Sequence, residues 1–307
     1  MAEIHFDIKH ISYSLGENRI DPSSLFDDDD GRVALKTGIN TVHRTDKTSL
    51  DLAIESVEKL KNDYLQDIGC VIYVTQSATN FLPNHASVIQ GMMGLPKNSI
   101  CFDINQGCSG FVQALLVMSS ILESYDKELG LIICTDTYSH HLGKADRSTQ
   151  SLFSDGATAT IVSKCKKWRI IDSAHITDGD KAHFLKKPIN KDINLVMEGT
   201  KIFQWTRSEL GKSIKSMLNK NGLDVNDIDY YFIHQASKMV MNNVALGLGI
   251  KPSDVPSSLN ITGNLVSSSI PFLLSQNFKK FSESKRLVLS GFGVGLSLSS
   301  CVIENVS

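Results

Sequence analysis

The chain has 307 residues, of which 41% are hydrophobic and 21% are charged, and its formal net charge is −2. This balance gives no electrostatic reason to expect binding to nucleic acid or to an anionic membrane surface. The six cysteines are scattered without metal-ligand spacing, and the N-terminus lacks the pattern of a signal peptide, so we expect a cytoplasmic protein with no metal site.

Short apolar runs alternate with amphipathic helical patterns along the chain, an order typical of α/β proteins. The N-terminal 15 residues alternate like a strand, the acidic run 27–30 is interpreted as a solvated loop rather than a metal site, and residues 48–63 predict a helix. Four later runs rich in Val, Ile and Leu are typical of buried strands. They are residues 68–75, 129–136, 228–234 and 286–291.

An internal repeat relates the two halves of the sequence. In the first half, a predicted strand ends 34 residues before Cys108 and the next begins 23 residues after it. In the second half, a strand ends 31 residues before Asn264 and the next begins, again, 23 residues after it. We therefore expect two copies of one α/β unit, residues 1–164 and 165–307, packed back to back with these two corners together.

Cys108 directly precedes the helical pattern "SGFVQALLVMSSILES", which places its thiol at a helix N-terminus. Unpaired amide groups and the helix dipole favour an anion there, so we expect a lowered pKa for Cys108 and a thiolate nucleophile. The alternative role is that of a small buried hydrophobe. We assign that role to Cys70, Cys134 and Cys301, which lie within strand runs.

Two polar residues of the second half are the further candidates. His234 lies at the C-terminal end of a predicted buried strand, where α/β folds place functional groups. The repeat brings it beside Asn264, whose amide can cap a helix or donate hydrogen bonds to a developing oxyanion or enolate. The Gly-rich segment 290–297 fits a turn that directs a backbone N–H at the reacting carbon better than a phosphate cradle. The remaining histidines are interpreted as structural: His5, His10, His43, His85, His140, His141, His175 and His183.

An ordered set of segments resembles β-ketoacyl-ACP synthase III, a condensing enzyme of the thiolase superfamily. The resemblance implies an α/β fold, the five-layered αβαβα sandwich made of two duplicated halves, and an enzyme that needs no metal and no redox cofactor. The segments are "LKTGI" (35–39), "TQSATNFLP" (75–83), "DINQGCSGFVQAL" (103–115), "SDGATATIV" (154–162), "MEGTKIFQWTRSEL" (197–210), "HQAS" (234–237), "GNLVSSSIP" (263–271) and "GFGVG" (291–295).

The resemblance also implies a mechanism. Cys108 takes up an acyl group from acyl-CoA or acyl-ACP as a thioester, and the backbone N–H groups of Cys108 and Val294 form the oxyanion hole. His234 and Asn264 hold the thioester carbonyl of malonyl-ACP, which loses CO2 to leave an enolate that attacks the acyl group and yields 3-oxoacyl-ACP. The family is normally a homodimer, in which Leu82 would reach the acyl pocket of the other subunit.

Four positions correspond to the CoA or acyl-carrier-protein site of the family. Arg32 replaces a tryptophan that stacks on the CoA adenine, Lys36 replaces an arginine, Ser237 replaces an asparagine, and Arg147 is retained. Met239 stands where an arginine usually helps to dock the acidic carrier. Because these contacts differ, we expect a specialised rather than a housekeeping pathway.

Other functions on the same fold are kept as alternatives. Cys108 and His234 also suit acyl transfer to an alcohol or amine without loss of CO2, although relatives of that kind typically carry Asp in place of Asn264. Type III polyketide synthases share "QGC" and a loop similar to "GFGVG". A non-catalytic subunit is disfavoured because the cysteine is present, and a thiolase is disfavoured because segment 290–297 holds no second cysteine.

Overall fold

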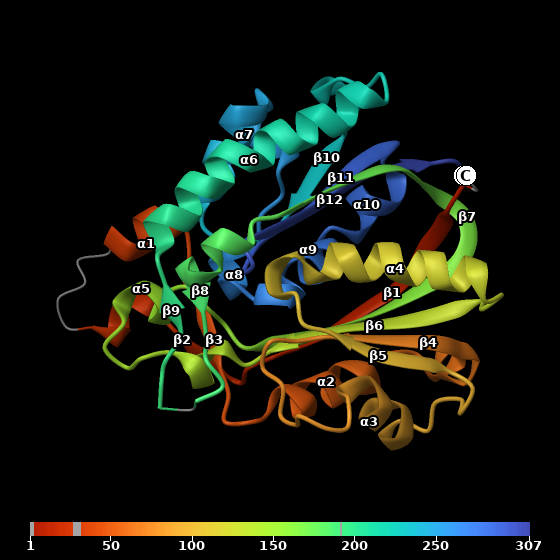
Figure 1. Ribbon diagram of the computed structural model, residues 1–307, viewed down its shortest axis with the longest axis horizontal. Coiled ribbons are helices and arrows are strands. Elements are labelled where there is room, and N and C mark those ends of the chain that lie inside the picture. Colours follow the sequence, from red (N-terminus) through yellow and green to blue (C-terminus); the bar gives the residue numbers. More distant parts are fainter. Residues whose placement is uncertain (1–2, 27–31, 191) are drawn as a thin grey trace.

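The computed structural model describes residues 3–26, 32–190 and 192–307, with the side chains of Arg32 and Asn62 left out. The acidic run 27–30 therefore lies outside the described residues. Within the described residues, the main sheet has eight strands and forms two layers (Figure 1). Helices lie between the two layers and cover their outer faces.

The first sheet layer has the strand order β5-β4-β6-β7-β1, in which β5, β4 and β6 are parallel and β7 and β1 are antiparallel to their neighbours. Helices α2 and α3 contact its outer face. The bounds are β1 (His5–Leu15), β4 (Ile68–Val74), β5 (Ile100–Ile104), β6 (Leu129–Asp136), β7 (Gly156–Thr177), α2 (Ser49–Glu58) and α3 (His85–Met92).

The second sheet layer has the order β10-β11-β12, followed by the C-terminal part of β7. Helix α6 contacts its outer face, and α7 packs on α6. The bounds are β10 (Tyr230–Ile233), β11 (Arg286–Gly293), β12 (Ser297–Asn305), α6 (Gly199–Lys220) and α7 (Lys238–Leu248).

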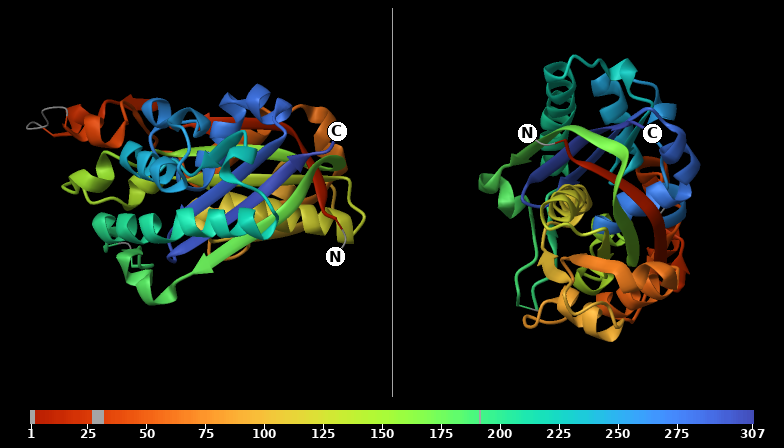
Figure 2. Two further views of the ribbon diagram at one scale, coloured as in Figure 1. Left: turned by 90° about the horizontal axis from the view of Figure 1, so that it is seen from above. Right: turned by 90° about the vertical axis from the view of Figure 1, so that its right-hand side faces the viewer.

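Helices α4 (Gly110–Ser124) and α9 (Ser269–Gln276) form the middle layer between the two sheets, and Figure 2 shows α4 end-on in this position. Because α4 contacts β4 and β6 on one side and β11 and β12 on the other, it must be apolar around most of its surface. This explains why residues 107–124 reach a mean hydropathy of 1.2, enough by length and composition for a membrane span, within a core helix. The predicted five-layered αβαβα sandwich is confirmed.

The strand pairings repeat as the sequence predicted. The parallel pair β4–β6 and the antiparallel pair β6–β7 of the first half correspond to β10–β11 and β11–β12 of the second. The predicted division after residue 164 falls inside β7, which continues from one sheet layer into the other. Its residues 156–163 pair with β6, and its residues 168–177 pair with β12.

The predicted helix 48–63 is shorter than expected. It begins after Thr48, which forms a capping box with Asp51, and ends at Glu58; a 3-10 turn over Asn62–Asp67 then leads into β4. At this end the Leu60 N–H donates to the Val57 carbonyl, three residues back, in a tight turn that closes the helix. Short elements complete the fold: α1 (Arg32–Thr37), α5 (Arg147–Gln150), α8 (Leu259–Thr262), α10 (Phe278–Glu283), β2 (Asn18–Ile20), β3 (Val42–Arg44), β8 (Leu185–Lys186) and β9 (Val196–Met197).

Candidate active site

Cys108 lies in a 3-10 turn, Gly107–Ser109, that continues directly into α4. Gly107 has a φ of +52°, and a side chain there would also clash with the carboxamide of Gln76, so the turn requires glycine. The Cys108 side chain is only 6% exposed. Its predicted place at the start of a central helix is confirmed.

His234 follows β10 directly, and its backbone N–H donates to the Ser290 carbonyl of β11 at 2.9 Å. The imidazole is buried and meets the ring of Phe292 edge to face, with 5.4 Å between ring centroids. Its Nδ1 has no hydrogen-bond partner among the described residues. Burial lowers the pKa of His234 to about 3, so the imidazole is neutral at physiological pH.

Two backbone hydrogen bonds to the segment 152–154 hold Asn264 in place. Its N–H donates to the Leu152 carbonyl at 2.9 Å, and its carbonyl accepts from the Ser154 N–H at 2.8 Å. The side-chain Oδ1 accepts from the Val266 N–H at 2.8 Å. Because Oδ1 is engaged in this bond, Nδ2 is the group with which the buried side chain can donate to a ligand.

The Gly-rich end of β11 passes directly against Cys108. A Cβ on Gly293 would lie 2.9 Å from Cys108 Cβ and 3.1 Å from Sγ, and a Cβ on Gly291 would meet the Cys108 carbonyl. The Val294 side chain packs over the preceding turn, where a Cβ on Gly107 would lie 3.0 Å from Val294 Cγ1. These glycines therefore allow close approach of two backbones, as expected for a turn facing the thiol.

A cavity of about 770 Å³ unites the candidates, because Cys108, His234 and Asn264 all line it. Residues from both halves of the repeat thus meet at one place, as the duplicated scaffold predicted. Tyr138 and Phe292 also line the cavity. Lys36 and Arg147 also line it, and so do apolar side chains of α6 and α7.

The expected low pKa of Cys108 is not found. Burial raises the pKa of the Cys108 thiol above its usual value, and the carboxylate of Asp136 raises it further. The physical reason is that the helix N-terminus is enclosed between two sheets, so desolvation of the thiolate outweighs the attraction of the helix dipole. The resting pair is a protonated thiol and a neutral imidazole.

Asp136 is a functional candidate that the sequence analysis did not identify. It ends β6 and is completely buried, and burial raises its pKa to about 6. Its carboxylate accepts from the Gln76 N–H at 2.8 Å and from the Ser267 hydroxyl at 2.6 Å. The sequence signal for Asp136 is its position at the C-terminal end of a buried strand. The same position pointed to His234.

The residues assigned to CoA or the carrier lie near the cavity where described. Lys36, Arg147 and Ser237 line it. Ser237 also caps α7, since its hydroxyl accepts from the Val240 N–H. The Arg147 guanidinium lies 4.8 Å from the centroid of the Phe26 ring. The side chain of Arg32 lies outside the described residues.

Leu82 does not line the cavity of its own chain. It is 79% exposed, next to Phe81, which is 93% exposed. Cys70, Cys134 and Cys301 are buried in strands as predicted, and all six cysteines are unpaired. In the described part of the chain, no three His, Cys, Asp or Glu side chains come together as a metal site requires.

Comparison with known proteins agrees with this arrangement. Residues 102–179 match the model of 3-oxoacyl-[acyl-carrier-protein (ACP)] synthase III, and residues 218–305 match the model of its C-terminal part. The chain is 30% identical to beta-ketoacyl-[acyl-carrier-protein] synthase III of Streptococcus agalactiae serotype III over 92% of its length and 93% of the relative. It is 28% identical to the Lactococcus lactis enzyme of the same name, over 97% and 98% of the two chains.

A solved structure shows the same fold. The crystal structure of 3-oxoacyl-(acyl-carrier protein) synthase from Burkholderia xenovorans superposes with a TM-score of 0.90 at 26% identity, covering 99% of this chain and 95% of the other. The family matches, the curated relatives and the shared fold agree along nearly the whole length. The chain belongs to the 3-oxoacyl-[acyl-carrier-protein] synthase III family of condensing acyltransferases.

Proposed function

We propose that this protein condenses an acyl group, carried as a thioester on Cys108, with malonyl-ACP to give 3-oxoacyl-ACP and CO2. The observation that carries the proposal is the meeting of Cys108, His234 and Asn264 in one cavity, with Nδ2 of Asn264 as its available donor. The relatives that carry the name beta-ketoacyl-ACP synthase III support the same reaction class.

In the first half-reaction, Cys108 Sγ attacks the carbonyl of an acyl-CoA or acyl-ACP thioester. The carbonyl oxygen gains negative charge, which the backbone N–H groups of Cys108 and Val294 stabilise. The carbon–sulfur bond of the donor breaks, and the leaving thiolate takes the proton that Cys108 gives up. Because burial disfavours a free thiolate at Cys108, this proton transfer accompanies the attack rather than preceding it.

In the second half-reaction, the malonyl thioester carbonyl lies between His234 and Asn264. Two donors at this oxygen stabilise the enolate formed when CO2 leaves; losing one such donor typically lowers a rate by about 10²–10³. A neutral imidazole can donate from one ring nitrogen, which is the form that burial enforces. The enolate carbon attacks the acyl carbonyl, and the thiolate of Cys108 leaves and regains a proton.

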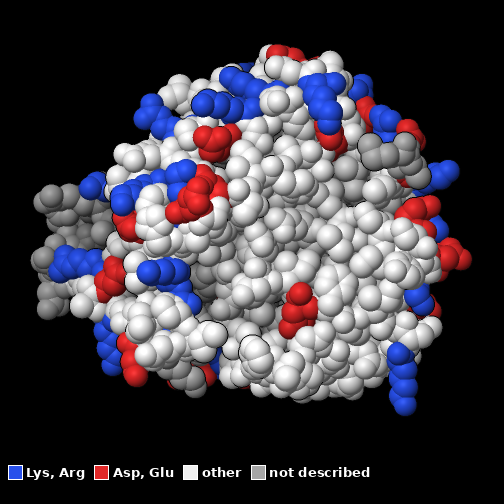
Figure 3. Space-filling model, viewed as in Figure 1, with Lys and Arg blue, Asp and Glu red and all other residues white. Residues whose placement is uncertain are grey.

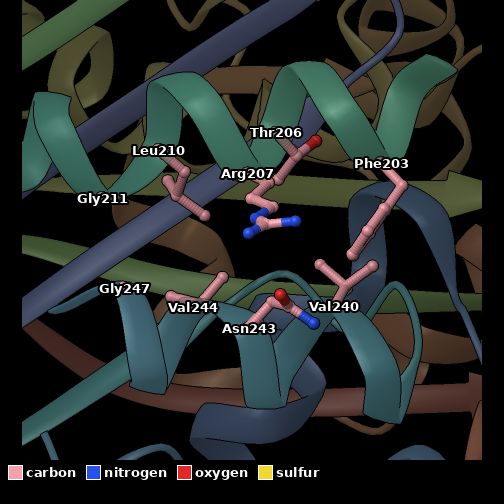
Figure 4. Close-up of a pocket in the computed structure, with 9 residues that line it drawn as sticks. All are labelled: Phe203, Thr206, Arg207, Leu210, Gly211, Val240, Asn243, Val244 and Gly247. Carbon is pink, nitrogen blue, oxygen red and sulfur yellow. The ribbon is translucent and has the colours of Figure 1, made fainter. Parts of the chain in front are cut away.

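Basic side chains beside the cavity suit an acidic carrier protein or the phosphates of CoA. Lys36 lines the cavity, and Lys238 lies between two lining residues. Arg207 reaches into the small seam between α6 and α7, toward Asn243 (Figure 4). None of these three cations forms an ion pair within the described part of the chain. Met239 stands where relatives usually carry a carrier-docking arginine, and these three cations would supply the positive charge instead. This changed set of basic residues supports a specialised pathway.

We also propose that the protein forms a homodimer through β5, the edge strand of the first sheet layer. Among the described residues, β5 pairs with one strand only, β4, and all five residues of β5 are half-buried. The surface over α4 and β5 is almost free of charged side chains (Figure 3). A second copy that adds its own β5 would cover this edge and bury Phe81 and Leu82. Light scattering during size-exclusion chromatography tests this, and a monomer at micromolar concentration would contradict it.

The reaction is tested by comparing the wild type with Asn264→Asp. Each protein is incubated with an acyl-CoA panel and malonyl-ACP, and intact-mass spectrometry follows acyl-Cys108 and the carrier. We expect acylation of Cys108 to persist and 3-oxoacyl-ACP formation to fall about 10²–10³-fold, because aspartate cannot donate at this position. Asn260→Asp, on the exposed surface, is the matched control and should behave like the wild type.

Acyl transfer to an alcohol or amine predicts a different pattern. Wild-type protein would then consume acyl-Cys108 with such acceptors and release no CO2 from malonyl-ACP. That pattern, or acyl-Cys108 and hydrolysis alone across the donor panel, would refute condensation.

The unpaired state of all six cysteines supports the proposed cytoplasmic location.

A further inference from the structure

We propose that Ser109 and Ser297 are positioning residues that hold the two sides of the oxyanion hole together. Their hydroxyl groups link the turn that carries Cys108 to the carbonyl group of Val294, and so fix the separation of the two backbone N–H donors. The inference rests on the proposed function, because it concerns the first half-reaction at Cys108. It is carried by two hydrogen bonds and by the packing of β11 on the turn.

The first hydrogen bond joins the two halves of the repeat beside the nucleophile. Ser109 directly follows Cys108 in the 3-10 turn, and Ser297 is the first residue of β12. The two serines are 188 residues apart in the chain, yet their Oγ atoms lie 2.8 Å apart. Both side chains are completely buried, so water does not compete for this bond.

The second hydrogen bond gives the pair a direction. The Ser297 hydroxyl donates to the Val294 carbonyl at 2.7 Å. Because a serine hydroxyl has one hydrogen and two acceptor lone pairs, Ser297 accepts from Ser109 while it donates to Val294. The Ser109 hydroxyl also lies 3.3 Å from the Gln106 carbonyl, which is a longer and weaker contact. A chain of hydrogen bonds therefore runs from Ser109 through Ser297 to Val294.

Packing alone does not fix the separation of the two N–H donors. A Cβ on Gly293 would lie 2.9 Å from Cys108 Cβ, so β11 runs close to the turn. Packing of this kind opposes closer approach, whereas the hydrogen bonds oppose separation. Together they hold Val294 at one distance from Cys108.

The far side of the Gly-rich turn is attached elsewhere. The Leu296 carbonyl accepts from the Asp178 N–H at 2.8 Å, and the Leu296 N–H donates to the Asp178 carbonyl at 3.2 Å. Asp178 directly follows β7, so this pair fixes the turn to the end of β7 rather than to Cys108. The position of Val294 relative to the nucleophile therefore depends on Ser297.

The experiment compares two reactions of the same thiol. With 4-nitrophenyl acetate, Cys108 Sγ bonds to the acetyl carbon through a tetrahedral oxyanion, 4-nitrophenolate leaves with its bonding electrons, and the thiol proton passes to water. With iodoacetamide, Sγ bonds to the methylene carbon, iodide leaves, the proton again passes to water, and no oxyanion forms. Peptide mass spectrometry follows both modifications at Cys108. Only acetylation should depend on the two serines, because only acetylation uses the oxyanion hole.

Two variants and their combination test the chain of hydrogen bonds. Ser297→Ala removes its middle member and should slow acetylation at least about tenfold, less than the loss of a whole donor, while alkylation stays within about twofold of the wild type. Ser109→Ala leaves the bond from Ser297 to Val294 and should slow acetylation by a smaller factor, about three- to fivefold. The double variant should be no slower than Ser297→Ala, because Ser109 acts only through Ser297.

Ser300→Ala is the matched control. Ser300 of β12 and Ser290 of β11 are also buried, and their Oγ atoms lie 2.6 Å apart. This variant should lower the unfolding temperature by an amount comparable to Ser297→Ala and leave both reactions unchanged. Acetylation of Ser297→Ala within about twofold of the control would overturn the inference. Alkylation slowed by the same factor as acetylation would also overturn it, since the thiol itself would then have moved.

The test also distinguishes this inference from the proposed function. If Ser297→Ala does not fold, as judged by thermal unfolding, Ser109→Ala decides: slower acetylation with unchanged alkylation supports the inference, and two unchanged rates contradict it. Normal formation of 3-oxoacyl-ACP by the wild type, with Ser297→Ala acetylated at the control rate, refutes the role of the serines alone. Selective slowing of acetylation in a protein that never condenses with malonyl-ACP refutes the proposed function alone.

Discussion

Replacing Gly293 by alanine tests whether the close approach of β11 positions the nucleophile. The added Cβ would lie 2.9 Å from Cys108 Cβ, whereas two carbon atoms are at their optimum about 3.5–4.0 Å apart. One of the two backbones must therefore move by roughly 1 Å. A Cβ on Gly291 would clash with the Cys108 carbonyl, so β11 runs close to the turn at this position as well.

The magnitude follows from this displacement. Overpacking of this kind costs about 1–3 kcal/mol in the free energy of unfolding. Misplacing a reacting group by about 1 Å lowers a rate by about 10²-fold. We therefore expect Gly293→Ala to fold with a modestly lower unfolding temperature and to form acyl-Cys108 about a hundred times more slowly.

Quenched-flow intact-mass spectrometry measures the acylation rate, and urea unfolding measures the stability. Gly91→Ala is the matched control, since a Cβ on Gly91 in α3 meets no atom within 4 Å. It should leave acylation unchanged and raise stability by about 0.5–1 kcal/mol through helix propensity. A Gly293→Ala rate within about threefold of the wild type, which is less than about 1 kcal/mol in activation free energy, would refute the reasoning.

Three further predictions concern charge and anchoring. Burial is the main cause of the raised pKa of Cys108, and the negative charge of Asp136 adds to it. Asp136→Asn removes that charge, so alkylation of Cys108 by iodoacetamide at neutral pH should accelerate about three- to tenfold; slower alkylation would contradict this. His234 should show no NMR titration between neutral pH and pH 5, because burial lowers its pKa from 6.5 to about 3. The unfolded chain binds that proton more readily, so stability is lost as the pH falls below 6.5, and His234→Gln should weaken this dependence in urea unfolding. The buried ring of His85 forms hydrogen bonds with Thr79 and Asp103. His85→Ala removes them, so we expect a loss of about 2–4 kcal/mol in the free energy of unfolding. A loss below the error of urea titration would argue that His85 does not hold the Thr79 segment in place.

Much of the fold could be predicted because its signals are local. Strands β4 and β6 appear as continuous apolar runs, since both of their faces are covered by helices. The equal spacing after Cys108 and Asn264 reflects the passage of α4 and α9 through the same middle layer. The meeting of His234 with Cys108 followed from this duplication alone.

The features that could not be predicted depend on distant parts of the chain. The raised pKa of Cys108 arises from sheets on both sides of α4, and no local pattern reveals that enclosure. Tyr138 and Gln76 are 62 residues apart, and each is an ordinary loop residue until the fold brings them together. Asp136 likewise acquires its surroundings from loops that follow other strands.

Strand β7 has a mechanical consequence for the whole molecule. Since one unbroken strand supplies hydrogen bonds to both sheet layers, separating the two duplicated units would break main-chain hydrogen bonds in each layer. A protease cut or an inserted linker near residue 164 should therefore unfold both duplicated units together. We expect chemical denaturation to proceed as one cooperative event rather than as two successive steps.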